Sequence, residues 1–449
     1  MSARTPAGPS LLFVNAQLAD PEAGTLAFED LLVVEGRTVA RGAGARTQAS
    51  AARAETVDLA GAVLAPGFVD AHVHLREPGQ EDKETIASGT AAAVAGGFTS
   101  VACMPNTSPP LDEPGRLYYV AEKARRAGRA RVHPVAAITL GLAGERLADL
   151  AALVEAGAVA FSDDGRPVMH AGLMRHALEY ARDLGVPLVT HAEDLLLRGE
   201  GVMNEGPTAT RLGLPGIPAA CEVIAVERDL ELAALTGARL HVAHVSAEGS
   251  VEALRRAKVR GTRATGETAP HYFALTDEAV ARGGGYDTNA KMNPPLRSEA
   301  DRAAVLAGLA DGTLDVIATD HAPHTPREKE SDFAAAPFGV VGLETALAVA
   351  LTQVVRPGRL SLVALLRRFT TAPRTLLGLP DPLAPGEEAD LVAFDPETRW
   401  IVDRSAFRSK GRNTPFEGHE LSGRVLGTWV GGRAVYAAEP APAATGEVR

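Results

Sequence analysis

Cysteine is scarce in this chain: Cys103 and Cys221 are the only two among 449 residues. Two cysteines build neither a disulfide framework nor a cysteine-rich zinc module. Cys103 lies in a strand-like run and Cys221 in a helical one, and we expect both to be small buried side chains rather than nucleophiles. The scarcity suits a reducing compartment, so we expect a cytoplasmic protein.

Long apolar runs and an excess of positive charge are also missing. No stretch of about 18 residues lacks a charge or a turn former, so we expect no membrane span and no membrane partner. Residues 1–24 lack the charged start and the apolar run of a signal peptide. The 45 Lys and Arg against 56 Asp and Glu give a net charge of −11, which argues against a nucleic-acid partner.

The middle of the chain alternates apolar, strand-like runs with helical patterns. We predict strands over residues 63–74, 98–105, 131–138, 158–164, 186–193, 239–246, 262–269 and 315–322. We predict helices over residues 83–97, 114–128, 145–157, 170–185 and 218–237. Such β-then-α units indicate an α/β fold, a parallel (β/α)8 barrel of the TIM type. The rival, a doubly wound open sheet, ordinarily carries a Gly-rich phosphate turn where this chain has HVHLREPG.

Both ends of the chain have the pattern of short strands separated by turns, over residues 11–64 and 385–437. We therefore predict one β-sandwich subdomain built by both termini. Residues 1–64 would form its N-terminal part, residues 65–380 the barrel, and residues 381–449 its C-terminal part and a tail. The tails 1–9 and 438–449 are expected to be disordered because Pro, Ala, Ser and Gly dominate them.

His72 and His74 end the first predicted strand of the barrel. Alternate side chains of a strand share a face, so both imidazoles should point into the mouth of the barrel. Two converging imidazoles can hold a transition metal, and neutral nitrogen donors suit Zn²⁺. The pair is therefore a candidate half of a metal site.

Further ligand-type residues recur at later strand ends: the pair Asp163 and Asp164, then His191, His244 and Asp320. Four imidazoles and two carboxylates on five strand tips predict a two-metal hydrolase centre. The pattern does not choose between Asp163 and Asp164. His241 and His244 are three residues apart, so on a regular strand only one faces inward, and His244 lies nearer the tip.

Such a centre predicts chemistry at an amide carbonyl. Two metal ions would drive a bound water towards hydroxide, the nucleophile, and would polarise the carbonyl. Asp320 could bind a metal and also act as general acid and base, moving a proton to the leaving nitrogen. The expected reaction is hydrolysis or condensation of an amide.

Seven motifs, in order, give the chain a family resemblance. APGFVDAHVHLREPGQEDKETI, CMPNT, FSDDG, THAED, AHVS, NPPLR and ATDHAPH together resemble a class I dihydroorotase of the amidohydrolase superfamily, over about residues 60–430. The resemblance implies a zinc-dependent, reversible cyclisation of N-carbamoyl-L-aspartate to L-dihydroorotate with release of water. That reaction is the third step of de novo pyrimidine synthesis.

The resemblance also implies how the metal ligands are shared. His72, His74 and Asp320 would hold one zinc, and His191 and His244 the other. Asp164 would bridge both, since AVAFSDDG offers no lysine for the carboxylated-lysine bridge of many relatives. An aspartate bridge leaves open whether the second site fills, so two zinc ions per subunit are expected with the second less firmly assigned.

Arg76 follows His74 by two residues, and its guanidinium fork could bind the substrate carboxylate. The resemblance implies these substrate-binding residues: His74, Arg76, Asn106, Asn293, His324, Phe338 and Gly339. The aperiodic segment 324–339 and the stretch after Glu193 are candidate lids.

Two rival functions stay open. The chain could be a related cyclic amidohydrolase acting on hydantoin, dihydropyrimidine or allantoin, but neutral rings of this kind offer Arg76 no carboxylate. It could also be an inactive homologue that scaffolds aspartate transcarbamoylase, but all six ligand positions are filled. The expected partners are the small-molecule substrate, further copies of the chain in a homo-oligomer, and aspartate transcarbamoylase in a complex.

Overall fold

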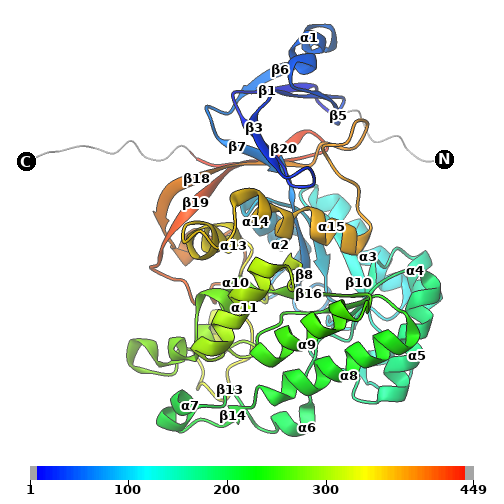
Figure 1. The fold of residues 1–449 in the computed structure, drawn as a ribbon, viewed down its shortest axis with the longest axis vertical. Coiled ribbons are helices and arrows are strands. Elements are labelled where there is room, and N and C mark those ends of the chain that lie inside the picture. Colours follow the sequence, from blue (N-terminus) through cyan, green and yellow to red (C-terminus); the bar gives the residue numbers. More distant parts are fainter. Residues whose placement is uncertain (1–7, 440–449) are drawn as a thin grey trace, which may run out of the picture.

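The computed structural model describes residues 8–439. A larger body of strands and helices lies below a smaller, mostly β part that both ends of the chain build (Figure 1). The disorder predicted for residues 1–7 and 440–449 lies outside the described residues. For residues 8–9 and 438–439, which the structure does describe, the prediction of disorder is wrong. There the Gly36 amide donates to the Pro9 carbonyl at 2.9 Å, and the Ala438 amide donates to the Leu426 carbonyl at 2.9 Å.

Eight parallel strands form the larger body, in the order that they have along the chain. They are β8 (Phe68–Val73), β9 (Phe98–Cys103), β10 (Arg131–Ala136), β11 (Ala160–Phe161), β12 (Leu188–Thr190), β15 (Leu240–Val242), β16 (Ala264–Thr268) and β17 (Val316–Ile317). Just beyond β17, His321 forms a parallel bridge with Val73, and its carbonyl accepts the His74 amide at 2.8 Å. This contact joins the last strand to the first. The predicted barrel and its eight strands are confirmed.

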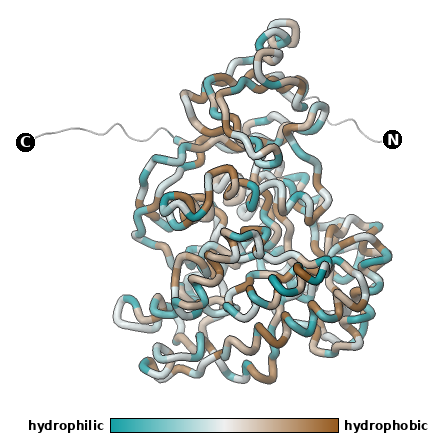
Figure 2. Tube along the Cα trace, viewed as in Figure 1, coloured by the Kyte–Doolittle hydropathy of each residue, from teal (hydrophilic) through white to brown (hydrophobic). Residues whose placement is uncertain are grey.

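Helices follow the strands and surround them (Figure 1). They are α2 (Ile86–Ala95), α3 (Pro114–Ala127), α4 (Leu150–Glu155), α5 (Ala171–Leu184), α8 (Ala220–Thr236), α9 (Glu248–Val259), α11 (Glu299–Asp311), α14 (Leu362–Phe369) and α15 (Thr371–Leu377). Ser298 caps α11, and its side chain accepts the Asp301 amide. Gly185 ends α5 in the left-handed conformation, as a closing glycine predicts. Brown and teal positions interleave along the outer helices, as expected for helices with one buried face (Figure 2).

Two sheets from both termini pack into a sandwich. The six-stranded sheet contains, in spatial order, β20 (Arg433–Ala437), β19 (Glu420–Val430), β18 (Leu391–Ile401), β7 (Val63–Pro66), β2 (Gln17–Asp20) and β3 (Thr25–Phe28). The four-stranded sheet contains β5 (Arg37–Arg41), β4 (Leu31–Val34), β1 (Leu11–Val14) and β6 (Glu55–Asp58), and α1 (Ala43–Ala52) packs on it. Between the sheets the rings of Phe13 and Trp429 meet edge-on, with centroids 5.1 Å apart.

The first predicted strand, residues 63–74, is in fact two strands in two sheets. β7 pairs with β18 and β2 in the sandwich, and β8 pairs with β9 in the barrel. Gly67 separates them, and a Cβ at this position would lie 2.2 Å from Cγ2 of Thr99. An apolar run has the same pattern in either sheet, so the strand pattern alone did not separate the two strands.

Short elements cover the carboxyl end of the barrel. They are α6 (Leu195–Arg198), β13 (Met203–Asn204), α7 (Pro207–Leu212), β14 (Gly216–Ile217), α10 (Pro270–Ala274) and α12 (Pro326–Lys329). After them, α13 (Ala346–Ala350) packs on β19. Across residues 8–439, no helix has the length and apolar character to cross a bilayer. Both cysteines are buried and free, and burial raises the pKa of Cys103 to about 12.

Candidate metal centre

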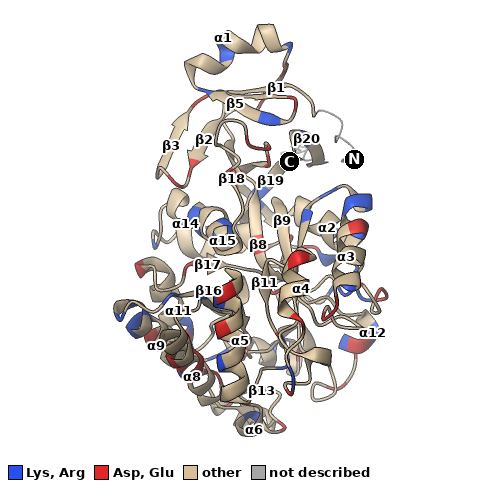
Figure 3. Cartoon of the chain, turned by 90° about the vertical axis from the view of Figure 1, so that its right-hand side faces the viewer, with Lys and Arg blue, Asp and Glu red and all other residues tan. Residues whose placement is uncertain are grey.

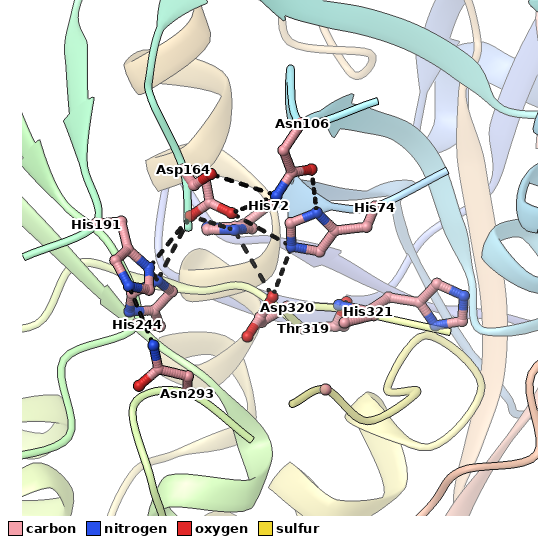
Figure 4. Close-up of polar contacts among 12 residues, drawn as sticks. His72, His74, Asn106, Asp164, His191, His244, Asn293, Thr319, Asp320 and His321 are labelled. Atoms are coloured by element: carbon pink, nitrogen blue, oxygen red, sulfur yellow. Dashed lines mark hydrogen bonds and ion pairs between the residues drawn. The ribbon is translucent and has the colours of Figure 1, made fainter. Parts of the chain in front are cut away.

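Six side chains predicted from the strand tips converge at one point at the carboxyl ends of the barrel strands (Figure 4). They are His72, His74, Asp164, His191, His244 and Asp320. His72 belongs to β8, and the others lie within three residues after β8, β11, β12, β15 and β17. All six are at most 7% exposed. The barrel therefore brings these six candidate metal ligands together.

The carboxylate of Asp164 lies at the middle of this cluster. Its Oδ1 is 3.3 Å from Nε2 of His72, 3.5 Å from Nδ1 of His191 and 3.6 Å from Nε2 of His244. Asp163 turns away and accepts the backbone amides of Ile138 and Thr139 at 2.8 and 3.0 Å. Of the two aspartates that the pattern left open, Asp164 is the one among the histidines.

Asp320 faces His72 and His74 from the end of β17, which is the neighbour of β8 in the closed barrel. Its Oδ1 lies 3.0 Å from Nε2 of His74 and 3.7 Å from Nε2 of His72. Burial works to raise the pKa of Asp320, but the hydrogen bond with His74 and the nearby imidazoles hold it at about 2. Asp320 is therefore a carboxylate at neutral pH.

The cluster fits a metal cofactor. Nε2 of His72 and Oδ1 of Asp164 are buried, face each other, and have no hydrogen-bond partner among the described residues. Two groups of donor atoms lie within 4.8 Å of one another: His72, His74 and Asp320, and His72, Asp164 and His244. Imidazole nitrogen and carboxylate oxygen are donors that suit Zn²⁺ and related transition metals. Unpaired buried donors of this kind are stabilised by a cation between them.

The charges of the cluster support the same conclusion. Burial opposes a charge on His72, but Asp164 and Glu267 raise the pKa of its imidazole well above the usual value. Burial also opposes a charge on Asp164, but the histidines hold the pKa of its carboxyl well below the usual value. The carboxylates favour a positive charge nearby. That charge can come from protonated imidazoles, or from metal ions bound in the cluster.

Three non-glycine residues at the site have left-handed backbones, with φ of 61° at Arg76, 35° at His244 and 48° at Asp320. Such a conformation is costly for residues other than glycine and is often found where a site fixes the direction of a side chain. Because the chain leaves regular strand geometry before His244, the expectation that His241 and His244 face opposite sides is wrong. His241 also lies inside the barrel, below His244.

Sequence reasoning missed the residues that support the histidines. Glu267 of β16 accepts from Nδ1 of His72 at 2.8 Å, and its other oxygen lies 3.1 Å from Nε2 of His241. Nδ1 of His241 in turn meets the Thr265 hydroxyl at 2.8 Å. A glutamate inside a predicted barrel strand was the available signal, because a buried acid needs a partner.

The predicted substrate residue Arg76 lies beside the cluster and is buried. Its Nε donates to the Pro323 carbonyl at 3.2 Å, and one terminal nitrogen lies 3.3 Å from Nε2 of His324. Within the described chain no carboxylate pairs with it, and burial lowers the pKa of its guanidinium to about 10. An unpaired buried guanidinium is well suited to an anion entering the site.

The remaining predicted contacts surround the cluster. Asn106 joins two ligands: its Oδ1 lies 2.9 Å from Nδ1 of His74, and its amide donates to Asp164 at 3.3 Å. The Asn293 amide donates to Glu193 at 3.1 Å and lies 3.4 Å from Nε2 of His191. In this structure both asparagines thus contact candidate metal ligands.

His324, Phe338 and Gly339 meet on the segment after β17. Nε2 of His324 donates to the Phe338 carbonyl at 2.8 Å. Gly339 has a φ of 133°, and a Cβ there would lie 3.0 Å from Nε2 of His324 and 2.9 Å from the Ala322 carbonyl. The close packing requires glycine at this position.

Two buried lysines that the sequence did not single out hold this segment. Lys291 donates to the carbonyls of Phe333, Ala334 and Ala336 at 2.7, 3.0 and 2.7 Å. Lys329 donates to the carbonyls of Thr288, Lys291 and Pro337 at 2.9, 3.2 and 2.8 Å. Burial lowers the pKa of Lys291 to about 8 and that of Lys329 to about 7. The segment after β17 is therefore held by hydrogen bonds from two buried lysines.

Known families and relatives share these sequence features. A family described as dihydro-orotase-like matches residues 61–250. The dihydroorotase of Syntrophotalea carbinolica is 52% identical over 427 residues, which cover 95% of this chain and 99% of that protein. The dihydroorotase of Desulforapulum autotrophicum is 54% identical over 385 residues, 86% of this chain and 89% of that protein.

Solved structures share the fold. The L-hydantoinase (dihydropyrimidinase) from Arthrobacter aurescens has a TM-score of 0.83 at 27% identity, over 95% of this chain and 96% of that chain. A D-hydantoinase from a Bacillus sp. AR9 has a TM-score of 0.81 at 25% identity, over 95% of each chain. The agreement over nearly the full length includes both the barrel and the sandwich.

Proposed function

The chain belongs to the dihydroorotase family of the amidohydrolase superfamily, and we propose that it interconverts N-carbamoyl-L-aspartate and L-dihydroorotate at the six-residue cluster. In the forward direction an amide bond closes the ring and one water leaves; the reverse direction consumes that water. The reaction is the third step of de novo pyrimidine synthesis. The observation that carries the proposal is the buried cluster of four histidines and two aspartates beside an unpaired arginine.

We assign zinc as the cofactor, two ions per subunit. His72, His74 and Asp320 would hold one ion, His191 and His244 the other, and Asp164 would bridge them. Zinc ions held there would activate a water molecule and polarise the amide carbonyl. The unpartnered Oδ1 of Asp164, within 3.6 Å of three imidazoles, supports the bridging role.

Arg76 would bind the carboxylate that dihydroorotate carries and neutral cyclic amides lack. Its guanidinium has a fork of donors that matches a carboxylate in shape and charge. Because the chain as a whole is acidic, with a net charge of −11, a local cation is needed to draw an anion into the site. We propose His74, Asn106, Asn293, His324, Phe338 and Gly339 as the further substrate contacts.

Asp320 would move the proton during ring opening and closure. Its pKa of about 2 means that Asp320 is ionised at neutral pH and so has the unprotonated oxygen that a general base needs, and Nε2 of His74 at 3.0 Å fixes its direction. After taking the proton, Asp320 would donate it to the leaving nitrogen. One carboxylate thus acts as base and then as acid.

Purified protein with zinc, assayed in both directions, tests the proposal. We expect turnover of dihydroorotate and carbamoyl aspartate, far slower hydrolysis of dihydrouracil, and loss of turnover in Asp320→Ala. Faster hydrolysis of dihydrouracil would favour a dihydropyrimidinase instead. Full activity of Asp320→Ala would overturn the proton-transfer role.

Several wider assignments accompany this proposal. We propose a cytoplasmic enzyme that assembles as a homo-oligomer and forms a complex with aspartate transcarbamoylase. Size-exclusion chromatography with and without that partner tests the assembly. The division of the chain at residues 64 and 380 stays a prediction, which separate expression of residues 65–380 would test.

A further inference from the structure

A pocket of about 440 Å³ lies at the end of the barrel opposite the metal centre. The residues that begin β12, β15, β16 and β17 line it, together with α14 and α15. Its apolar lining includes Pro187, Leu240, Val316, Ala372 and Leu376. The pocket is of the size that small-molecule sites have, about 300–1,000 Å³. Because the metal ligands follow the carboxyl ends of the strands, this pocket does not belong to the active-site mouth.

Four arginines line the pocket: Arg239, Arg263, Arg367 and Arg368. Figure 3 shows positively charged positions on α14 and α15 beside β17. None of the four forms an ion pair within residues 8–439. The one carboxylate of the lining, Asp315, is already bound by Lys258, whose Nζ lies 2.8 and 2.7 Å from its two oxygens.

The guanidinium groups of Arg239 and Arg368 are held in place by backbone carbonyls, which do not neutralise their charge. Arg239 donates to the Leu376 carbonyl at 2.6 Å and Arg368 to the Leu309 carbonyl at 3.1 Å, while Nε of Arg368 is buried without a partner in the described chain. Burial and the charge of Arg263 lower the pKa of Arg239. Like charges face one another in an otherwise acidic protein, so an anion between them would relieve the repulsion.

We propose that this pocket binds a small phosphate-bearing organic molecule of nucleotide size. Guanidinium forks bind phosphate oxygens in pairs, and the hydroxyl-bearing Thr262 and Thr371 also line the pocket. The apolar lining would contact the organic part. A pocket with both arginines and apolar residues in its lining favours a molecule that has a phosphate and an organic group over inorganic phosphate.

Calorimetry on the full chain at low salt, with AMP, adenosine and inorganic phosphate as separate probes, tests the proposal. AMP and phosphate are weak zinc ligands and should not strip the metal from the protein. The zinc content of the protein is measured before and after each titration to check this. We expect saturable binding of AMP, weaker binding of phosphate and none of adenosine. AMP affinity should fall as salt rises.

A double variant locates the site. Arg263→Gln with Arg367→Gln removes two exposed pocket charges and should weaken AMP binding by about tenfold or more. Arg125→Gln with Arg126→Gln changes the net charge equally on the exposed face of α3 and should leave the affinity unchanged. Unsaturable binding, an equal loss in the control, or undiminished binding in the pocket variant would overturn the proposal; the last result would place AMP outside this pocket.

Discussion

Oε1 of Glu267 lies 2.8 Å from Nδ1 of His72, on the side of the ring opposite the unpartnered Nε2. A carboxylate in this position accepts a hydrogen bond from Nδ1–H of His72 and leaves the Nε2 lone pair free to bind a metal on the side of Asp164. Burial opposes a charge on Glu267, but hydrogen bonds with the His241 and His72 imidazoles and their charges hold the pKa of its carboxyl well below the usual value. Glu267 thus sets both the direction and the tautomer of His72.

Replacing this glutamate should weaken metal binding. We expect Glu267→Gln to lower zinc affinity by about 10- to 100-fold, because the amide supports the required tautomer less well than a carboxylate. Competition with a zinc chelator measures the change. Glu344→Gln, an acid beside Arg408 and Ser409 and outside the cluster, is the matched control and should bind zinc as the unmodified chain does.

Arg76→Gln should lower kcat/KM for dihydroorotate by about 10- to 100-fold, since one charge-assisted contact with the substrate carboxylate is lost. Hydrolysis of neutral dihydrouracil should change little, so the ratio of the two rates reports the specificity. Arg76→Lys keeps the positive charge but loses the two-pronged guanidinium, so we expect its kcat/KM for dihydroorotate to lie between those of the unmodified chain and Arg76→Gln. A parallel loss on both substrates would show that Arg76 supports the fold of the site rather than the carboxylate.

Lys329 should order the segment that covers the site. In Lys329→Met three carbonyls lose a charged donor, so the amides of residues 333–339 should lose about 2 kcal/mol of protection. Hydrogen exchange followed by mass spectrometry measures this, and KM for dihydroorotate should rise. Lys123→Met, which removes a half-exposed lysine of α3, serves as control. Unchanged exchange over residues 333–339 would contradict the role given to Lys329.

Glu344 should make stability depend on pH. Burial raises the pKa of its carboxyl from 4.5 to about 7, so the folded chain binds a proton that the unfolded chain releases. The contribution of Glu344 to the free energy of unfolding is fully present below about pH 4.5 and is lost as pH rises through 7. Glu344→Gln should remove about 1 to 3 kcal/mol of this pH dependence in denaturant titrations. An identical pH profile for the variant would show that Glu344 ionises normally.

The sequence predicted which side chains gather in the cluster because strand tips of a parallel barrel meet at one end. Each of His72, His191 and Asp320 needed only its place at the end of an apolar run. His241 was assigned to the wrong side because the alternation rule assumes a regular strand, and the backbone turns at His244 with a φ of 35°. Local geometry of this kind leaves no periodic signal.

Other features depend on contacts between distant segments. Glu267 reaches His72 across 195 positions of sequence, and Lys329 reaches the carbonyl of Lys291 only once both segments have folded. The arginine pocket draws on four strand starts and two helices, each unremarkable alone. No local pattern could have joined these residues.

Turnover measured against metal content shows whether the reaction depends on bound zinc. Protein stripped by a chelator and then titrated with zinc should show no conversion of dihydroorotate at first and full conversion at about two zinc ions per chain. If His244 is a zinc ligand, the His244→Ala variant should not reach full conversion of dihydroorotate in the same zinc titration. Undiminished conversion of dihydroorotate by the metal-free protein would show that the reaction does not need the metal.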